Sequence, residues 1–261
     1  TMGLSLPGTA TALAGSAKKE RIAFDSGEKV MELIKKNITA KQIITKKSLE
    51  NAIMVDLALG GSTNTTLHIP AIAHAAEIDL DIKSFDILSH KTPQLCSLRP
   101  GGELMMEDLD WAGGIPALLK NLAPLLHQSC PTVSGYTIKQ IYDATPTADE
   151  NVIRPLSNPI AKEGGISILF GTLAPDGAVV KTGAIPKSMH TFIGKAKVFD
   201  SEDLAMTALK ANKIKAGDIL IVRNEGPKGG PGMRESLALT AAIAGIGLGN
   251  SIAIITDGRF S

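Results

Sequence analysis

The stretch GPKGGPGMRE, residues 226–235, consists mainly of glycine and proline and ends on the carboxylate of Glu235. The residues before it, GDILIVRNE (217–225), have the apolar pattern of a strand, and the residues after it, SLALTAAIAGIGLG (236–249), have that of a helix. Connections from a strand to a helix are places where sites are often built. The stretch therefore indicates a candidate site beside Glu235.

The residues of this loop admit a functional and a purely structural interpretation. Glycines allow the backbone to approach a ligand closely, and successive amides before a helix can bind an anion. Glu235 falls in the first turn of the following helix, where the helix dipole alone favours an acid. The loop has neither of the two common phosphate-binding glycine spacings. A sharp turn with a favourably placed acid is therefore the alternative to a ligand site.

The segment TDGRFS, residues 256–261, is organised in a similar way. An apolar strand ends, an Asp-Gly turn follows, and Ser261 stands at its tip. A serine hydroxyl is a weak base that needs a neighbouring base or cation for activation. Ser261 is therefore a candidate site residue only if such a neighbour activates it, and the usual alternative is an ordinary turn or cap residue.

The composition of the 261-residue chain predicts a globular protein that binds neither nucleic acid nor membranes. Apolar residues make up 44% and charged residues 20%, and the formal charge of +1 gives no basic surface for nucleic acid. Apolar runs stay below the roughly 18 residues that span a bilayer. Two cysteines, Cys96 and Cys130, form no disulfide framework. We interpret both as buried small hydrophobes and expect a cytoplasmic protein.

The character of the chain changes between residues 144 and 165, a segment rich in proline, asparagine and charge that is typical of a linker. Before it, the patterns are mostly helical with short strands such as LCSL (95–98). After it come short β-rich runs and one clear helix, 201–212, capped by Ser201. In the first part, we expect helices to open at Ser26, Thr39 and Ser48, and to be interrupted at Pro70 and at Gly113–Gly114.

Other polar residues offer weaker candidates. His68 and His74 are six positions apart, so they lie on different faces of a helix and cannot chelate one metal together. The loop GGSTN (60–64) places Thr63 and Asn64 either as hydrogen-bonding groups for a ligand or as caps of the next helix.

Six motifs occur in one order along the chain: GLSLPG, LGGSTN, GTLAPDGAVVKTG, VFDSEDLAM, GPKGGPGMRE and ITDGRFS. Together they resemble the dihydroxy-acid dehydratase family, which includes phosphogluconate and aldonate dehydratases. The resemblance covers the whole chain and implies a central piece of such a protein that lacks both ends. The expected fold is α/β. Residues 1–150 would be the second part of an N-terminal α/β domain, and residues 160–261 the first part of a β-rich, barrel-like C-terminal domain.

The resemblance implies a hydro-lyase that converts a 2,3-dihydroxy acid into a 2-oxo acid. The leading interpretation is an enzyme of valine, isoleucine and leucine biosynthesis, in a homodimer or higher homo-oligomer. A sugar-acid dehydratase, acting on 6-phosphogluconate or an aldonate, and a catalytically inactive structural piece are the alternatives. We expect the 261 residues alone to be inactive.

The resemblance also implies cofactors and residue roles. Family members carry an iron–sulfur cluster held by three cysteines and a Mg²⁺ bound by acids and a modified lysine. The glutamate of GMRE is one Mg²⁺ ligand and the serine of GRFS is the proposed proton acceptor, which implies these roles for Glu235 and Ser261. The cluster cysteines belong upstream of GLSLPG, so Cys96 and Cys130 do not match them.

Overall fold

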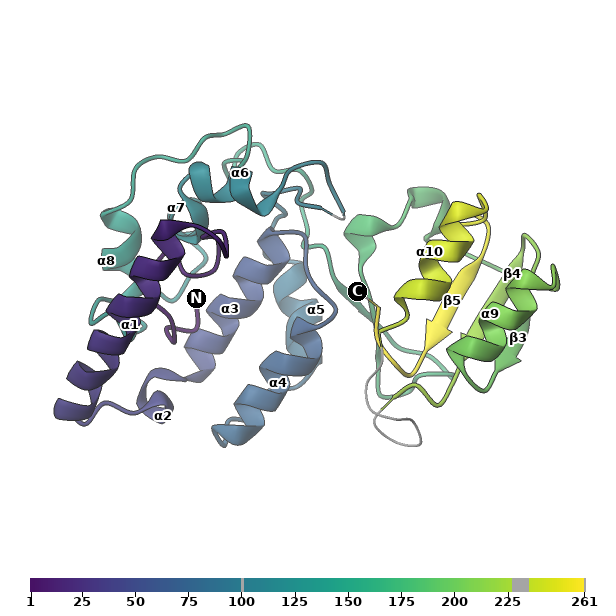
Figure 1. The fold of residues 1–261 in the computed structure, drawn as a ribbon, viewed down its shortest axis with the longest axis horizontal. Coiled ribbons are helices and arrows are strands. Elements are labelled where there is room, and N and C mark those ends of the chain that lie inside the picture. The colour runs from purple at the N-terminus through teal and green to yellow at the C-terminus, as the bar shows by residue number, and fades with distance from the viewer. Residues whose placement is uncertain (100, 227–234, 261) are drawn as a thin grey trace. The chain divides into compact units, whose positions relative to one another are not determined.

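The computed structural model describes residues 1–99, 101–226 and 235–260, in two compact units, Thr1–Gly183 and Ala184–Ser261 (Figure 1). Each unit has a hydrophobic core of its own. Helices combine with a two-stranded and a three-stranded sheet. This combination confirms the expected α/β class.

Unit 1, Thr1–Gly183, is mostly helical and ends with a short antiparallel hairpin of two strands. Its described elements are α1 (Ala17–Lys35), α2 (Ala40–Ile43), α3 (Lys46–Ala58), α4 (Thr65–Ala75), α5 (Lys83–Ser89), α6 (Met106–Trp111), α7 (Gly114–Asn121), α8 (Ile138–Asp143), β1 (Ser167–Leu169) and β2 (Ala178–Val180). A 3₁₀ turn, η1 (Thr182–Ala184), follows the hairpin.

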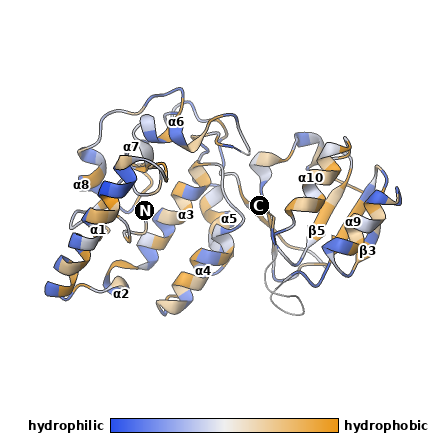
Figure 2. Cartoon of the chain, viewed as in Figure 1, coloured by the Kyte–Doolittle hydropathy of each residue, from blue (hydrophilic) through white to orange (hydrophobic). Residues whose placement is uncertain are grey.

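Helix α3 is the centre of unit 1, because both of its sides are apolar and both are covered. Leu49, Ile53 and Leu57 are spaced four residues apart and share one face, which packs with α4, α5 and β1. Met54 and Val55 on the other side join the core formed with α6, α7 and α8. Eight of the 13 residues of α3 are buried, and the exposed Lys46 and Lys47 lie in its first turn, so the helix carries hydrophobic residues on two sides and hydrophilic ones at its start (Figure 2).

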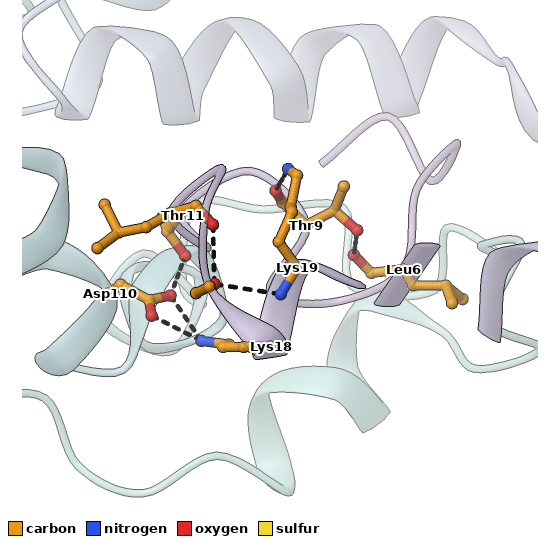
Figure 3. A network of polar contacts seen from close by, with 8 residues as sticks. Leu6, Thr9, Thr11, Lys18, Lys19 and Asp110 are labelled. Carbon is orange, nitrogen blue, oxygen red and sulfur yellow. Dashed lines mark hydrogen bonds and ion pairs between the residues drawn. The ribbon is translucent and has the colours of Figure 1, made fainter. Parts of the chain in front are cut away.

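Helix α1 is attached to unit 1 through a polar network at its N-terminal end (Figure 3). Ser16 caps the helix by accepting a hydrogen bond from the Lys19 amide. Lys18 donates to both carboxylate oxygens of Asp110 at 2.7 Å, and Thr11 donates to the same carboxylate. Lys19 donates to the carbonyl of Thr9. The start of α1 is thereby tied to α6 and to the loop before α1.

Unit 2, Ala184–Ser261, is a parallel three-stranded sheet with strand order β3-β4-β5. Its elements are η2 (Lys187–Met189), β3 (Lys195–Phe199), α9 (Glu202–Lys210), β4 (Asp218–Val222), α10 (Leu237–Gly245) and β5 (Ala253–Thr256). Helices α9 and α10 contact each other and cover one face of the sheet (Figure 1). Leu220 and Val222 of the central strand point into the core beneath these helices.

Three local predictions from the sequence were wrong. The first helix begins at Ala17 rather than Ser26, because Ser16 caps it and the Ser26 hydroxyl donates to the Ile22 carbonyl within the helix. Helix α4 continues through Pro70, where packing of its buried side chains offsets one lost backbone hydrogen bond. The segment LCSL forms no strand; the Leu95 and Cys96 amides both donate to the carbonyl of Ala58 at the end of α3.

The segment 144–165 belongs to unit 1 and is mostly exposed, with a few buried residues, and its interpretation as a linker stays a prediction. Ile153 is fully buried, and the amide of Ile160 donates to the carbonyl of Gln94 at 2.9 Å. The division into domains 1–150 and 160–261 stays a prediction, as does the barrel-like form of the second. The described strands of unit 2 form an open sheet.

Candidate functional site at the carboxyl ends of the parallel strands

The three parallel strands of unit 2 end at one edge of the sheet, and polar residues follow each of them. Strand β3 is followed by Asp200, β4 by Arg223 to Glu225, and β5 by Asp257. In open parallel sheets, ligands bind outside the carboxyl ends of the strands. This edge, together with the loop that leads to Glu235, is therefore the candidate site.

Asp257 joins the end of β5 to the end of β4. Its two carboxylate oxygens accept hydrogen bonds from the amides of Asn224 and Glu225, at 3.1 and 3.0 Å. The backbones are so close here that a Cβ on Gly226 would lie 2.6 Å from the carbonyl oxygen of Asp257. Only glycine fits at position 226, which explains the first glycine of the loop that the sequence singled out.

The turn that contains Asp257, residues 256–260, also contacts Glu235 at the far end of the glycine-rich loop. Its carboxylate lies 3.5 Å from the Nε of Arg259, and the two residues form a parallel β-bridge. The amide of Ser236 donates to the carbonyl of Arg259 at 2.9 Å. The Glu235 side chain keeps 39% of its surface exposed. The turn 256–260 thus binds both the entry and the exit of the glycine-rich loop and leaves the Glu235 carboxylate open to solvent.

Two buried carboxylates organise the helices behind this edge. Glu225 accepts a hydrogen bond from the Glu202 amide at 2.7 Å, at the first residue of α9. Glu202 in turn accepts from the Leu239 amide at 3.0 Å, in the first turn of α10. Carboxylates at helix N-termini satisfy free amides and complement the helix dipole. Glu202 and Glu225 are therefore structural acids that fix the helices relative to the sheet.

Ser261 and residues 227–234 lie outside the described residues, so the structure places neither the predicted base nor most of the predicted glycine nest. Phe260, which precedes Ser261, is described, as is the turn that holds Glu235. The candidate residues that sequence reasoning missed are Asp257 and Arg259. Their signal is their place in the Asp-Gly turn directly after β5, where any side chain lies at the carboxyl edge.

Unit 1 has a second glycine-rich loop, GGSTN, beside the carboxylate of Asp56. The Oδ2 of Asp56 accepts hydrogen bonds from the Ser62 amide at 3.2 Å and from the Thr65 hydroxyl at 2.8 Å. Burial raises the pKa of Asp56 to about 6, although these hydrogen bonds and Lys181 oppose the shift. Asp56 thereby ties the end of α3 to the start of α4, which favours the structural interpretation of GGSTN.

The backbone of this loop is in close contact with the segment before β1. A Cβ on Gly165 would lie 2.0 Å from the carbonyl oxygen of Gly60, and one on Gly61 would lie 2.5 Å from the Ile166 side chain. Asp56 also lines a cavity of about 220 Å³, with Gly3 and Pro7 of the motif GLSLPG among its other walls. Two of the sequence motifs, GLSLPG and LGGSTN, therefore meet in one region of unit 1.

The cysteines and histidines do not gather into a site. Cys96 and Cys130 are both buried in the core around α3 and α7, which confirms the interpretation of them as small hydrophobes. Burial raises the pKa of Cys96 to about 12. His127 pairs with Glu50 at 2.6 Å. Among the described residues, no group of three or more histidines, cysteines and acids is placed to hold a metal.

Comparisons with known proteins give the same family for both parts of the chain. Models of the dihydroxy-acid/6-phosphogluconate dehydratase N-terminal and C-terminal domains match residues 1–141 and 151–261. The chain is 58% identical over all 261 residues to a dihydroxy-acid dehydratase of Geotalea daltonii, and 56% identical to those of Citrifermentans bemidjiense and Geobacter sulfurreducens. It covers 47% of each of these proteins, so it spans about half the length of the curated relatives it matches. No described helix is long and apolar enough to cross a membrane.

Proposed function

Because the chain belongs to the dihydroxy-acid/6-phosphogluconate dehydratase family, we propose that it forms part of a hydro-lyase that converts a 2,3-dihydroxy carboxylic acid into a 2-oxo acid. The observation that carries the narrower proposal is the 56–58% identity, over the full chain, with proteins named dihydroxy-acid dehydratase. The proposed role is therefore the dehydration step of valine, isoleucine and leucine biosynthesis. A cytoplasmic homo-oligomer is part of the same proposal.

Glu235 fits the role of one Mg²⁺ ligand. Its carboxylate oxygens are hard donors of the kind Mg²⁺ prefers, and they are partly exposed at the carboxyl edge of the sheet. Mg²⁺ requires near-octahedral oxygen coordination, and the described residues supply only this part of it. The proposal therefore assigns the remaining ligands to residues outside these 261. When bound, the ion would stabilise negative charge on the substrate.

The cysteines of this chain do not fit an iron–sulfur cluster. Such clusters are held by thiolates, and burial of Cys96 and Cys130 in an apolar core opposes the loss of their protons. The proposal therefore places the cluster of the family on residues outside this chain. It also predicts that the 261 residues alone show no dehydration.

The chain's own contribution to catalysis would be to position an acid and a base at one edge of the sheet. Asp257 and Arg259 hold the two ends of the glycine-rich loop, so Glu235 and the segment leading to Ser261 are fixed by the same turn. Ser261 would accept the proton from C2 of the substrate, with its alkoxide stabilised by neighbouring positive charge. Glycine amides of the loop would face the substrate carboxylate.

A chimera tests this proposal. The 261 residues replace the matching half of the Geotalea daltonii relative, and the product is reconstituted without oxygen and assayed on 2,3-dihydroxyisovalerate and on 6-phosphogluconate. We expect turnover of the first acid and at least about a hundredfold lower activity on the second. Preference for the phosphorylated acid would instead assign the chain to the sugar-acid dehydratases. A folded chimera that holds the cluster yet dehydrates neither acid would refute the proposal.

The role of Ser261 is tested in the same chimera by two measurements. Ser261→Ala should nearly abolish turnover and also exchange of the substrate's C2 proton with solvent, while the visible spectrum of the cluster is unchanged. If the alanine variant exchanges that proton at the parent rate, a residue outside this chain is the base.

A further inference from the structure

Helices α3 and α5 pack against each other in unit 1 (Figure 1), and a groove of about 450 Å³ lies along their contact. On α3, the lining residues Lys46, Glu50 and Met54 are four positions apart and therefore share one face of the helix. From Lys46 to Met54 this face extends about 12 Å along the helix axis. The volume lies within the range of small-molecule sites. We call this feature the α3–α5 groove.

The floor of the α3–α5 groove is apolar. Met54 is buried, Leu88 and Leu125 are half-buried, and all three belong to the core around α3 and α7. Ile87 of α5 also lines the groove but keeps 55% of its surface exposed, so it lies toward the opening. The described walls carry no aromatic ring on which a nucleobase could stack. The floor therefore suits a ligand with an aliphatic body, whose burial there is favourable.

Two lysines border the same groove and give it a positive charge. Lys46 stands in the first turn of α3 and Lys91 follows the end of α5, and both are exposed. Among the described lining residues, the acid is Glu50, and its Oε2 already lies 2.6 Å from the Nε2 of His127. Two cations beside one engaged acid favour a ligand that carries a negative charge.

The wall that contains His127 is fixed in place by a buried side chain of α3. Asn51 is fully buried, and its Oδ1 accepts a hydrogen bond from the His127 amide at 2.8 Å. Its Nδ2 donates to the His127 carbonyl at 3.0 Å. The contact with Glu50 holds the imidazole ring of the same residue. The groove is therefore preformed, which lowers the entropic cost of binding a ligand.

The apolar floor and the two lysines together define one class of ligand. We propose that the α3–α5 groove binds a small carboxylate with an apolar chain, whose charge lies beside the lysines and whose chain covers Met54, Leu88 and Leu125. Octanoate is a suitable probe, because its extended chain is similar in length to the groove face of α3. This inference goes beyond the proposed function, and its test measures binding rather than turnover, so that either can fail alone.

A series of probes tests the ligand class on the full 261-residue chain by saturation-transfer NMR titration. Octanoate should bind with a dissociation constant of about 0.1–1 mM, as expected for a ligand of this size. Octanol keeps the chain without the charge, acetate keeps the charge without the chain, and each should bind at least about tenfold more weakly. Octylamine, with the opposite charge, should bind most weakly. Equal affinity for octanoate and octylamine would overturn the proposal, because the lysines would then contribute nothing.

Lysine substitutions locate the bound carboxylate. Lys46→Gln and Lys91→Gln should each weaken octanoate binding about threefold, and the double variant about tenfold. Lys83→Gln is the matched control, because Lys83 belongs to α5 but lies over the Phe170 ring and does not line the groove. Equal losses in the three single variants, or no loss in any of them, would overturn the proposal.

A charge at the opening tests the position of the chain. Ile87→Glu should weaken octanoate binding at least about tenfold, whereas Val30→Glu, at a similarly exposed position on α1, should not change it. Circular dichroism confirms that each variant keeps its helices. Parent affinity in the Ile87→Glu variant would overturn the proposal. Binding by the 261 residues but not by the folded chimera would also overturn it, because the other half of the protein would then occupy the groove.

Discussion

The two glycine-rich loops of the molecule hold their carboxylates in opposite ways. In unit 1, Asp56 is turned inward, accepts hydrogen bonds from the GGSTN loop, and has its pKa raised by burial. In unit 2, Glu235 lies beside Arg259 and stays partly open to solvent. The first carboxylate is engaged by its own loop, whereas the second stays accessible from solvent.

The two loops also differ in how closely the rest of their unit packs around them. The GGSTN loop packs against Gly165 and Ile166 beside two large clusters of buried side chains. The two ends of the loop before Glu235 are held by backbone amides and by one turn, in a unit that has a single core cluster. Two glycine-rich segments beside an acidic residue therefore have different environments. The GGSTN loop is closely packed in unit 1, whereas Glu235 lies at an accessible edge of the sheet in unit 2.

The largest effect should come from disturbing the close packing of the GGSTN loop. Gly165→Ala places a Cβ against the carbonyl oxygen of Gly60 and should lower the free energy of unfolding of unit 1 by about 4 kcal/mol. Urea unfolding followed by Trp111 fluorescence measures this, because the single tryptophan lies in unit 1. Gly171→Ala, where an added Cβ meets nothing within 4 Å, is the matched control. Equal midpoints for the two variants would contradict the close contact.

The accessible edge should respond in activity rather than in stability. In the chimera, Glu235→Gln keeps the size of the side chain but removes its charge, and should reduce turnover at least about a hundredfold. The Mg²⁺ concentration needed for half-maximal activity should rise, while the unfolding midpoint changes little. Asp203→Asn, an exposed acid in the first turn of α9, should leave both unchanged. Full activity of the Gln variant would remove Glu235 from the site.

The partial burial of the Asp56 carboxylate should make the free energy of unfolding depend on pH. The native pKa of Asp56, about 6, is above its ordinary value of 3.8, so folding favours the protonated form. The stability that this group contributes is present below about pH 4 and is lost as the pH rises through 6. Between pH 4 and 7, the parent should therefore lose about 2 kcal/mol relative to Asp56→Asn.

Urea unfolding at several pH values measures this difference. The exposed Asp79→Asn in the same unit serves as the control and should follow the parent. If Asp56→Asn also follows the parent at every pH, the carboxylate is not buried as described.

The smallest effect concerns the helix caps of unit 2. Ser201 accepts a hydrogen bond from the Leu204 amide at 3.2 Å, and Ser201→Ala should destabilise α9 by about 1 kcal/mol. Amide hydrogen exchange in α9 and β4 measures this, and Ser201→Asp should restore the parent protection. The amides of α3 in unit 1 should not change; faster exchange there would mean that the units do not unfold separately.

The strands of unit 2 could be predicted well because their signal is local. KAKVF and DILIV are short apolar runs bounded by glycine or charge, and β3 and β4 coincide with them. The helix after Ser201 was found from its cap and its first-turn acids. The start of α1 was missed because a serine inside a helix can bond to its own backbone and so resembles a cap in sequence alone.

The candidate site was only partly predictable, because its geometry depends on contacts between distant segments. Glu235 could be named from its loop, but its pairing with Arg259 joins residues 24 positions apart through the parallel register of the sheet. The burial of Ile153 within the mostly exposed segment 144–165 likewise depends on distant residues, since the amide of the neighbouring Arg154 donates to the carbonyl of Leu95. Proline and charge predicted the exposure of most of this segment, but not the few residues that tertiary packing buries.

The positions of the two thiols allow the opening of one unit to be measured separately from the other. Both cysteines lie in the same core cluster of unit 1, and unit 2 contains none. A small alkylating reagent can therefore reach sulfur only when the core around α3 and α7 opens. The rate of alkylation therefore measures how often that core opens, and it does not report directly on conformational changes near Glu235. The two thiols of unit 1 thus report the opening rate of that unit, and the effect of a ligand bound to unit 2 can be compared with this rate.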